Sequence, residues 1–148
     1  MDSGERGVET FTVRRADWAA DQVALRAVRE AVFVREQHVP LDLEWDEHDA
    51  VSVHVLAVAP DARAIGTGRL LLDGHIGRMA VLRDCRGRGV GTALLRELIG
   101  LAAQAGMREL VLHAQTHAVA FYQRFGFVTD SEPFMEAGIA HCTMRRKL

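Results

Sequence analysis

One run of glycine and arginine has residue types and spacing that indicate a binding function. Residues 86–92 read RGRGVGT and precede a long stretch with apolar residues at helical spacing. Three glycines allow the backbone to approach a ligand closely. The N–H groups at the start of a following helix would form an anion site favoured by the helix dipole. The two arginines suit a phosphate or pyrophosphate. The segment is therefore a candidate phosphate-binding loop, the alternative being a glycine turn with surface arginines.

Three classes of phosphate ligand use such loops. A Walker loop ends in Gly-Lys-Ser/Thr, whereas this one ends in Gly91-Thr92 without a lysine. A dinucleotide fingerprint needs a third glycine where Thr92 stands, and it belongs near the first strand of a βαβ array. The third class is coenzyme A. Arg86, Gly89 and Gly91 resemble the pattern Arg/Gln-x-x-Gly-x-Gly/Ala of the GNAT N-acetyltransferases, and this resemblance implies that the loop binds the pyrophosphate of coenzyme A.

A second segment extends the resemblance. Residues 113–127 read HAQTHAVAFYQRFGF and are similar to the second GNAT signature, a strand leading into a helix that ends in Tyr-x-x-x-Gly-Phe. Tyr122, Gly126 and Phe127 fall on that pattern. The family's tyrosine protonates the departing thiolate, and a positioned acid has a chemical reason there because thioester aminolysis expels a thiolate. The resemblance implies that Tyr122, the only tyrosine in the chain, is catalytic. The alternative is a core aromatic residue with its hydroxyl at the surface.

The resemblance covers essentially the whole chain. Residues 32–37, the acidic segment 42–49, residues 77–81 and residues 136–141 are similar to a small bacterial subgroup that mostly lacks assigned substrates. In the family, the strand before the loop supplies backbone groups that pair with the pantetheine and polarise the thioester carbonyl. Gln115 stands where many members carry an asparagine that contacts the pantetheine arm. The cofactor is thus expected to be acetyl-CoA, bound by Met79, Ala80, Val81, Arg86, Gly87, Arg88, Gly89, Val90, Gly91, Thr92, Gln115 and Tyr122.

The acceptor side needs a base or a proton path, because an amine must be neutral to attack. Four carboxylates follow the first predicted helix, in a region that commonly forms the acceptor wall in the family. They would suit a cationic amine, or they belong to a solvated acidic loop. His54 and His75 on predicted strands are further base candidates, although His54 also fits a buried core histidine. The predicted substrate-binding residues are Glu44, Asp46, Glu47, Asp49, His54 and His141.

Metal and thiol chemistry are not predicted. His113 and His117 are four residues apart, but the first falls on a predicted strand and the second on a predicted helix, which disfavours a shared zinc ion. Cys85 adjoins the glycine loop and is interpreted as small loop filler, because GNAT enzymes usually transfer the acyl group directly. Cys85 and Cys142 are too few for a disulfide framework and fit no metal spacing, which favours a reducing cytosol.

Hydrophobic periodicity and turn residues predict the elements that position these groups. Asp17 is the expected N-cap of the first helix, and Gly106 is expected to end the second. We expect strands at 10–14, 52–59, 64–72, 75–81 and 110–114, and two further strands between 127 and 146, joined around 137–138. We expect helices from 17 through 33 to a point before 39, at 89–105, and from 116 to before 126. This order predicts an α/β fold (α+β by layer), a GNAT-like mixed, mostly antiparallel central sheet with helices on both faces.

Length and composition limit the function classes. The 148 residues predict a single domain, 1–148, and 49% hydrophobic with 26% charged residues is typical of a globular protein. A net charge of −2 argues against a nucleic-acid binder. The apolar stretches fall short of the roughly 18 residues of a membrane span. The first nine residues lack the apolar core of a signal peptide, so a cytoplasmic location is expected.

The sequence therefore predicts an acetyl-CoA-dependent N-acyltransferase. It would transfer an acetyl group to a primary amine by direct attack in a ternary complex, the acceptor being a small molecule or a protein. The alternative is a non-catalytic acyl-CoA-binding sensor or regulatory module that keeps the glycine loop but lacks a working acceptor site. Tyr122 favours the enzyme, since a sensor needs no acid at the thiol. Whether the protein forms a homodimer is left open.

Overall fold

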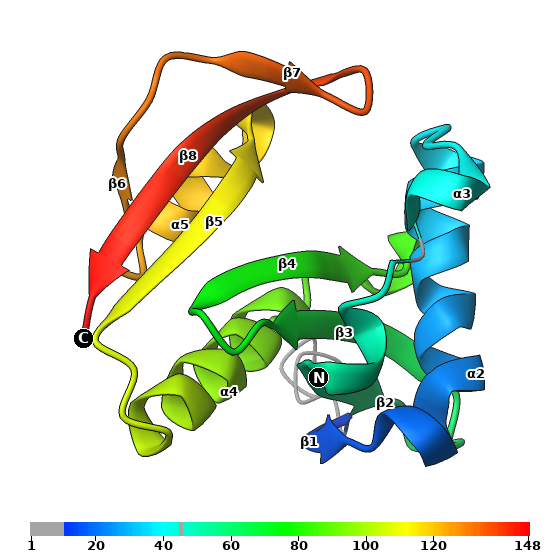
Figure 1. Ribbon diagram of the computed structural model, residues 1–148. Coiled ribbons are helices and arrows are strands. Elements are labelled where there is room, and N and C mark those ends of the chain that lie inside the picture. Colours follow the sequence, from blue (N-terminus) through cyan, green and yellow to red (C-terminus); the bar gives the residue numbers. More distant parts are fainter. Residues whose placement is uncertain (1–10, 45) are drawn as a thin grey trace, which may run out of the picture.

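An eight-stranded sheet forms the centre of the computed structural model, which describes residues 11–44 and 46–148 (Figure 1). The strands lie in the order β1-β2-β3-β4-β5-β8-β6, and β7 pairs with β8. The pair β4–β5 is parallel and the other pairs are antiparallel. The strands are β1 (Thr12–Ala16), β2 (Val53–Val58), β3 (Ala64–Leu70), β4 (His75–Val81), β5 (Glu109–Gln115), β6 (Val128–Thr129), β7 (Phe134–Glu136) and β8 (Ile139–Lys147).

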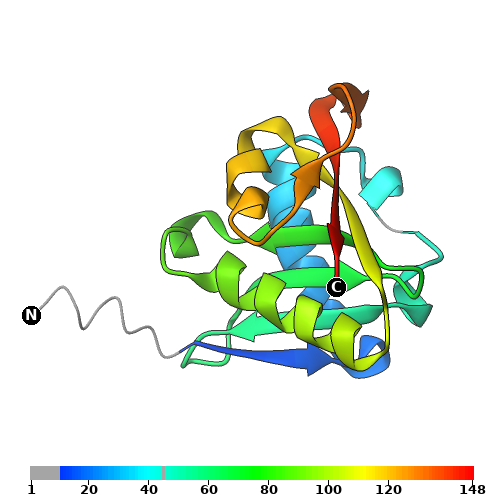
Figure 2. The same cartoon turned by 90° about the vertical axis from the view of Figure 1, so that its left-hand side faces the viewer.

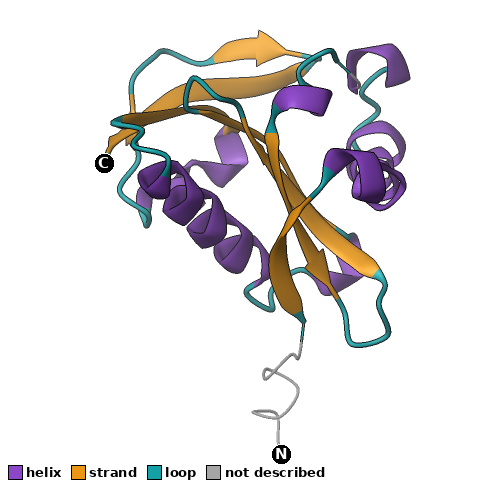
Figure 3. Ribbon diagram, turned by 60° about the horizontal axis from the view of Figure 1, so that its bottom comes forward, coloured by secondary structure: helices purple, strands orange, loops and turns teal. Residues whose placement is uncertain are grey.

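Helices lie on both sides of this sheet, as predicted (Figure 3). One side carries α2 (Trp18–Arg29), a π-helical continuation (Glu30–Glu36) and the short α3 (Leu41–Glu44). The other side carries α4 (Val90–Gln104) and α5 (Val119–Gln123). In Figure 2, α4 lies on the viewer's side of the sheet. The fold is therefore the expected mixed, mostly antiparallel sheet between two helical layers.

The first helix begins where its capping residue predicts and ends before Pro40, as predicted. The Asp17 carboxylate accepts the N–H of Ala20 at 3.1 Å, which satisfies a donor of the first turn. After Arg29 the helix widens, and the N–H of Gln37 donates to the carbonyl of Val32, five residues back, at 3.0 Å. The prediction ended this helix before Val39 and Pro40, and the wider turns carry the backbone to Glu36, within that limit.

The main core lies between α4 and the sheet. Leu94, Leu95 and Leu98 are completely buried in it. The helix can pack this closely because β3 has glycine beneath it: a Cβ on Gly68 would lie 2.8 Å from Cδ1 of Leu98. Tyr122 and Phe127 extend the same core toward the C-terminal part of the sheet.

Three segments differ from the sequence prediction. The first strand begins at Thr12, two residues late, and Thr10 lies outside the described residues. The acidic segment contains α3 and a 3₁₀ turn (Asp49–Val51) where a loop was expected. The tail forms three strands rather than two, because β6 spans only Val128–Thr129 and has little apolar pattern to reveal it. The predicted turn at 137–138 is confirmed, with both residues at positive φ.

Candidate active site

A cleft opens where β4 and β5 part. The two strands are paired only at His75–Val111 and Ile76–Leu112, and beyond these pairs they diverge (Figure 1). On its other edge β4 carries one extra residue, because Thr67 and Arg69 of β3 face Ala80 and Gly77. This bulge contains Arg78 at φ 52°. The resulting cleft has a volume of about 1470 Å³ and is lined from both strands, the glycine loop, α5 and the β7–β8 hairpin.

The glycine loop presents backbone donors at one end of this cleft. Gly87 and Gly89 have φ values of 78° and 85°, which favour glycine. The first hydrogen bond of α4 runs from Ala93 to the carbonyl of Gly89 at 3.0 Å. The N–H groups of residues 90–92 precede it and are therefore available to an anion. A Cβ at Gly87 or Gly89 would meet nothing within 4 Å, so the loop has room for a phosphate group.

Arg86 is engaged by a carboxylate. Its Nη1 and Nη2 donate to Glu36 at 2.7 and 2.6 Å, and its Nε donates to the carbonyl of Val81 at 2.9 Å. The hydrogen bond with Glu36 raises the pKa of the Arg86 guanidinium and lowers that of the Glu36 carboxyl. The predicted phosphate-binding arginine is thus paired with the last residue of the π-helical segment. The Glu36 carboxylate accepts the two hydrogen bonds that Arg86 could otherwise donate to a phosphate.

Tyr122 lines the cleft from the side of the α4 core. It is 9% exposed, and its ring contacts Phe121 and Phe127 edge-on at centroid distances of 5.1 and 6.0 Å. Burial raises the pKa of its phenol to about 12. Within the described residues its hydroxyl has no hydrogen-bond partner. A protonated, pre-positioned phenol is able to donate to a developing anion in the cleft.

Gln115 takes part in an amide pair across the cleft. Its Nε2 donates to Oε1 of Gln37 at 3.0 Å, and Nε2 of Gln37 donates back to Oε1 of Gln115 at 3.3 Å. His117 approaches the same oxygen at 2.7 Å. The pair joins β5 to the end of the π-helical segment.

Three carboxylates of the acidic segment belong to a buried ion-pair network. Arg29 is fully buried and donates to Glu44 and, at 2.8 Å, to Asp49. Arg69 of β3 bridges Asp49 and Asp46 at 3.0 and 2.8 Å. Arg78 closes the network, contacting Asp46 at 3.1 Å and Glu44 at 3.4 Å. The expectation of a solvated loop therefore does not describe these three, whose charges are matched by three arginines; Glu47 is exposed.

Burial and ion pairing act in opposite directions on this network. Burial opposes ionisation of Asp49, but hydrogen bonds and charge from Arg29 and Arg69 outweigh it, and its pKa is lowered. The pKa of Asp46 is lowered in the same way by Arg69 and Arg78. For Glu44 burial dominates and raises the pKa, although Arg29 and Arg78 limit the rise.

The predicted histidines have different surroundings. His54 is 1% exposed, stacks on Trp18, and donates from Nε2 to the carbonyl of Asp49 at 2.8 Å. Its pKa is lowered by burial, and it serves as a core residue away from the cleft. His141 is 7% exposed and lines the cleft, with Nδ1 donating to the carbonyl of Ile139 at 2.7 Å. His75 lines it as well and pairs with Asp73 at 3.0 Å.

The structure thus brings most of the predicted cofactor residues to one cleft. Of the described residues predicted for cofactor or acceptor, those that line it are Met79, Ala80, Val81, Arg86, Gly87, Gly89, Val90, Gly91, Thr92, Gln115, Tyr122, Glu44 and His141. Those that do not are Arg88, Asp46, Glu47, Asp49 and His54. In the part of the chain that the structure describes, no three metal-ligating side chains come together. Nor is any helix there long and apolar enough to cross a membrane.

Sequence reasoning missed several residues that line the cleft. Glu36 and Gln37 lie in a segment that resembles the bacterial subgroup, but the resemblance assigned them no role. Arg69 and Arg78 stand on predicted strands close to an acidic segment, and a charged residue within a strand pattern is a signal for a buried partner. That signal was present, although the sequence could not pair it with particular carboxylates.

The cleft thus lies where the mixed sheet splits, with the glycine loop at one end and a buried phenol in its wall. A model of the acetyltransferase (GNAT) domain matches residues 6–148. The uncharacterized N-acetyltransferase YjcF of Bacillus subtilis is 38% identical over 123 residues, 80% of this chain and 87% of YjcF. The uncharacterized protein YyaT of the same organism is 33% identical over 144 residues, 93% of this chain and 97% of YyaT.

Solved structures agree with the family match. An acyl-CoA N-acyltransferase from Pseudomonas aeruginosa superimposes with a TM-score of 0.82 at 31% identity, over 93% of this chain and 99% of that one. Escherichia coli ElaA gives a TM-score of 0.81 at 30% identity, over 91% and 99%. The chain belongs to the GNAT acetyltransferase family.

Proposed function

We propose that the protein transfers an acetyl group from acetyl-CoA to a primary amine by direct attack within a ternary complex. The observation that carries the proposal is the position of Tyr122: a buried, protonated phenol lines the same cleft as the backbone donors at the start of α4. A protein that only bound acyl-CoA would have no use for an acid there. The acyl-CoA N-acyltransferase from Pseudomonas aeruginosa, with the same fold, supports this choice.

Different residues of the cleft would bind the cofactor and assist the reaction. The N–H groups of residues 90–92 would hold the pyrophosphate, and the backbone of 79–81, beside the bulge of β4, would pair with the pantetheine and face the carbonyl oxygen. Acetyl-CoA supplies the activated acyl group as a thioester. Tyr122 would donate its proton to the sulfur as the carbon–sulfur bond breaks, which lowers the cost of expelling a thiolate.

Direct transfer is favoured over an acyl-enzyme because the one thiol lining the cleft is poorly suited to attack. Cys85 is 3% exposed, and burial together with the neighbouring Asp84 raises the pKa of its thiol. A nucleophilic cysteine requires the opposite, a lowered pKa and access. The acetyl group would therefore pass straight to the acceptor.

The test combines binding with turnover. Thermal-shift measurements with acetyl-CoA, coenzyme A, NAD and ATP should give stabilisation by the first two, and thiol release should follow when primary amines are added with acetyl-CoA. Tyr122→Phe should keep the stabilisation by acetyl-CoA while kcat falls about 10²-fold. Stabilisation without thiol release for any amine would leave the sensor as the function. Wild-type kcat in Tyr122→Phe, with chemistry rate-limiting, would remove Tyr122 from the mechanism.

A further inference from the structure

His113 lies at the point where the sheet splits. Ile76–Leu112 is the last pair between β4 and β5, so the next residues along the two parallel strands are Gly77 and His113. Both line the cleft. Gly77 has no side chain, and a Cβ placed there would meet nothing within 4 Å. Open space therefore adjoins the imidazole of His113, next to the bulge of β4.

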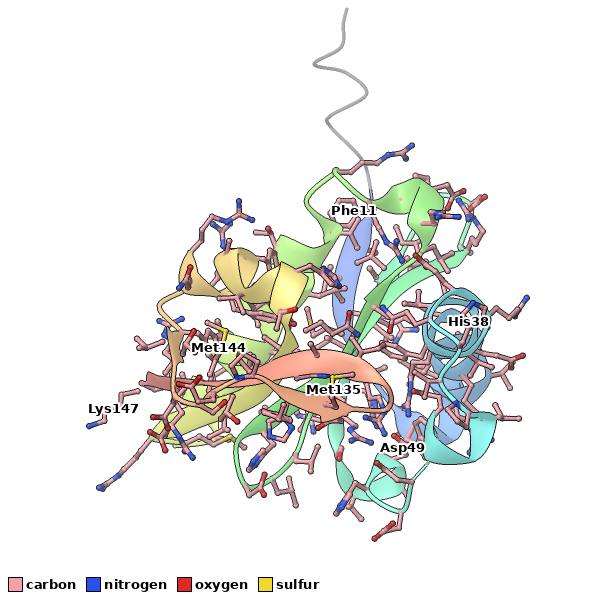
Figure 4. All side chains as sticks on the ribbon, turned by 90° about the horizontal axis from the view of Figure 1, so that it is seen from above. Phe11, His38, Asp49, Met135, Met144 and Lys147 are labelled. Carbon is pink, nitrogen blue, oxygen red and sulfur yellow. The ribbon has the colours of Figure 1, made fainter. Side chains whose placement is uncertain are left out.

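A carboxylate fixes the orientation of this imidazole. Nδ1 of His113 lies 2.8 Å from Oε1 of Glu136 on β7, and Phe134 of the same strand packs edge-on against the ring at 5.1 Å. Since a carboxylate accepts the hydrogen bond, Nδ1 carries the hydrogen, and the lone pair of the neutral ring is on Nε2. The β7–β8 hairpin that holds Glu136 reaches across the molecule from the side of Met144 toward α2 (Figure 4).

His113 and Tyr122 are on opposite faces of the split sheet. Leu112 and Ala114, on either side of His113, are buried in the α4 core together with Tyr122. Because side chains alternate along a strand, His113 points to the other face, toward α2 and α3. A thioester lying in the split would have the phenol on one side and the imidazole on the other.

We propose that His113 is the general base for the acceptor amine and that Glu136 is its positioning residue. The proposal rests on the proposed function. Nε2 of His113 takes one proton from the incoming ammonium group. The neutral nitrogen then bonds to the carbonyl carbon, and the electron pair of the carbon–sulfur bond leaves on sulfur, which receives the phenol proton of Tyr122. The second proton lost by the nitrogen restores Tyr122, and His113 returns its own to solvent.

Other titratable groups face the same region, but each has a feature that argues against this role. His75 of β4 stands where the strands are still paired, and it is held by Asp73 of the hairpin turn. His141 of β8 is nearly buried. On the opposite wall, Glu44 contacts Arg29 and Arg78. His113 combines an oriented ring, 41% exposure and adjoining open space.

The test uses acceptors that differ in basicity but little in size. Ethylamine is protonated at neutral pH, whereas 2,2,2-trifluoroethylamine is neutral there and needs no prior deprotonation. In His113→Asn, kcat/KM for ethylamine should fall about 10²-fold or more, and that for trifluoroethylamine much less. Glu136→Gln should lose less activity than His113→Asn, with the larger loss again for ethylamine, because the imidazole remains but a carboxylate no longer orients it. Glu109→Gln is the matched control: it removes a carboxylate paired with Arg145 across β5 and β8, outside the cleft, and should behave as wild type.

Stabilisation by acetyl-CoA verifies that each variant is folded, and His113→Gln replaces the asparagine variant if that one does not fold. Equal losses with both amines, or an unchanged pH profile in both His113 variants, would overturn the assignment while the proposed function stood. A wild type that releases no thiol with any amine would reject both. Long-range ¹H–¹⁵N NMR gives an independent reading: His113 should carry its hydrogen on Nδ1 when neutral, and the other tautomer would contradict the role of Glu136.

Discussion

At the scale of single residues, Tyr122 gives the protein a measurable pH dependence of stability. Its pKa is raised from 10.0 to about 12 by burial, so the folded state holds the phenol proton more tightly than the unfolded state does. The stability that this contributes is complete below pH 10 and is lost as the pH rises toward 12. The full effect is about 2.7 kcal/mol, from about two units at 1.36 kcal/mol each.

Tyr122→Phe lacks this titration and should lose less stability between those pH values. Because the chain has a single tyrosine, the difference between the two proteins isolates one phenol. Urea unfolding of both at pH 9 and near pH 12 measures it. Parallel losses in the two proteins would contradict a buried phenol.

Residues with a local signature were the ones that the sequence could identify. Gly89, Gly91 and Tyr122 stand in short patterns whose chemistry is readable without a fold, and the structure brings all three to the cleft. The roles of Arg29 and Glu36 depend on partners 15 and 50 residues away. No local pattern encodes such a pairing, so the acidic segment was interpreted as acceptor wall or solvated loop, when it is mostly a buried network.

At the scale of elements, the start of α4 permits a substitution that separates binding from folding. A Cβ on Gly91 would lie 3.6 Å from Phe121, an ordinary contact, and would stand among the N–H groups available to the pyrophosphate. Gly91→Ala should keep or slightly raise stability, because alanine favours a helix over glycine by up to about 1 kcal/mol. It should weaken acetyl-CoA binding at least severalfold.

Gly100→Ala is the matched control in the same helix, where a Cβ meets nothing within 4 Å. It should give the helical gain without a change in acetyl-CoA affinity. Isothermal titration calorimetry and thermal unfolding together distinguish the two effects. Equal affinity in both variants would show that the helix start does not approach the cofactor.

The junction of α2 with the acidic segment is held by charge rather than by apolar packing. Arg29→Met would leave Glu44 and Asp49 with one buried partner fewer and should destabilise the protein by about 3–5 kcal/mol at pH 7. Asp49 has a lowered pKa, so its contribution is present above its ordinary value of 3.8 and is lost as the pH falls through the folded value. The deficit of the variant should therefore shrink in acid.

Denaturant unfolding at pH 7 and near pH 2, below the ordinary pKa of Asp49, measures this dependence. Arg14→Met is the comparison: Arg14 is 51% exposed and pairs with Asp21, and its loss should cost at most about 1 kcal/mol. Similar losses in the two variants would contradict the burial of the Arg29 network.

At the scale of the whole molecule, one ion pair links the glycine loop to the helical layer that contains α2. Glu36 accepts hydrogen bonds from Nη1 and Nη2 of Arg86, and an incoming pyrophosphate would compete for the same two donors. Glu36→Gln should tighten acetyl-CoA binding by up to about fivefold, since a partly exposed pair contributes up to about 1 kcal/mol. The gain should diminish at high salt.

Glu30→Gln, which removes a carboxylate paired with Arg35 on the same π-helical segment, should leave the affinity unchanged. Titrations of both variants at two salt concentrations are sufficient. Weaker binding in Glu36→Gln would mean that Glu36 holds Arg86 in place for the cofactor instead of competing with it.

The architecture was predictable at this scale because the order of elements and their alternation constrain the layers. The divergence of β4 from β5 was not, since it depends on how far two strands distant in sequence remain paired. The position of the cleft could therefore be found only from the structure, although the sequence predicted most of the cofactor-binding residues that line it.

The short pairing of β4 and β5 also has a consequence for the protein in storage. Most sheets expose free backbone edges only at their two outermost strands, and such edges promote association between molecules. Here residues 77–81 and 113–115 form two additional inner edges within one sheet. Solutions without acetyl-CoA should scatter light sooner on standing than solutions that contain it, because the bound cofactor would cover both edges. Equal rates of scattering with and without acetyl-CoA would show that these edges are already protected by the walls of the cleft.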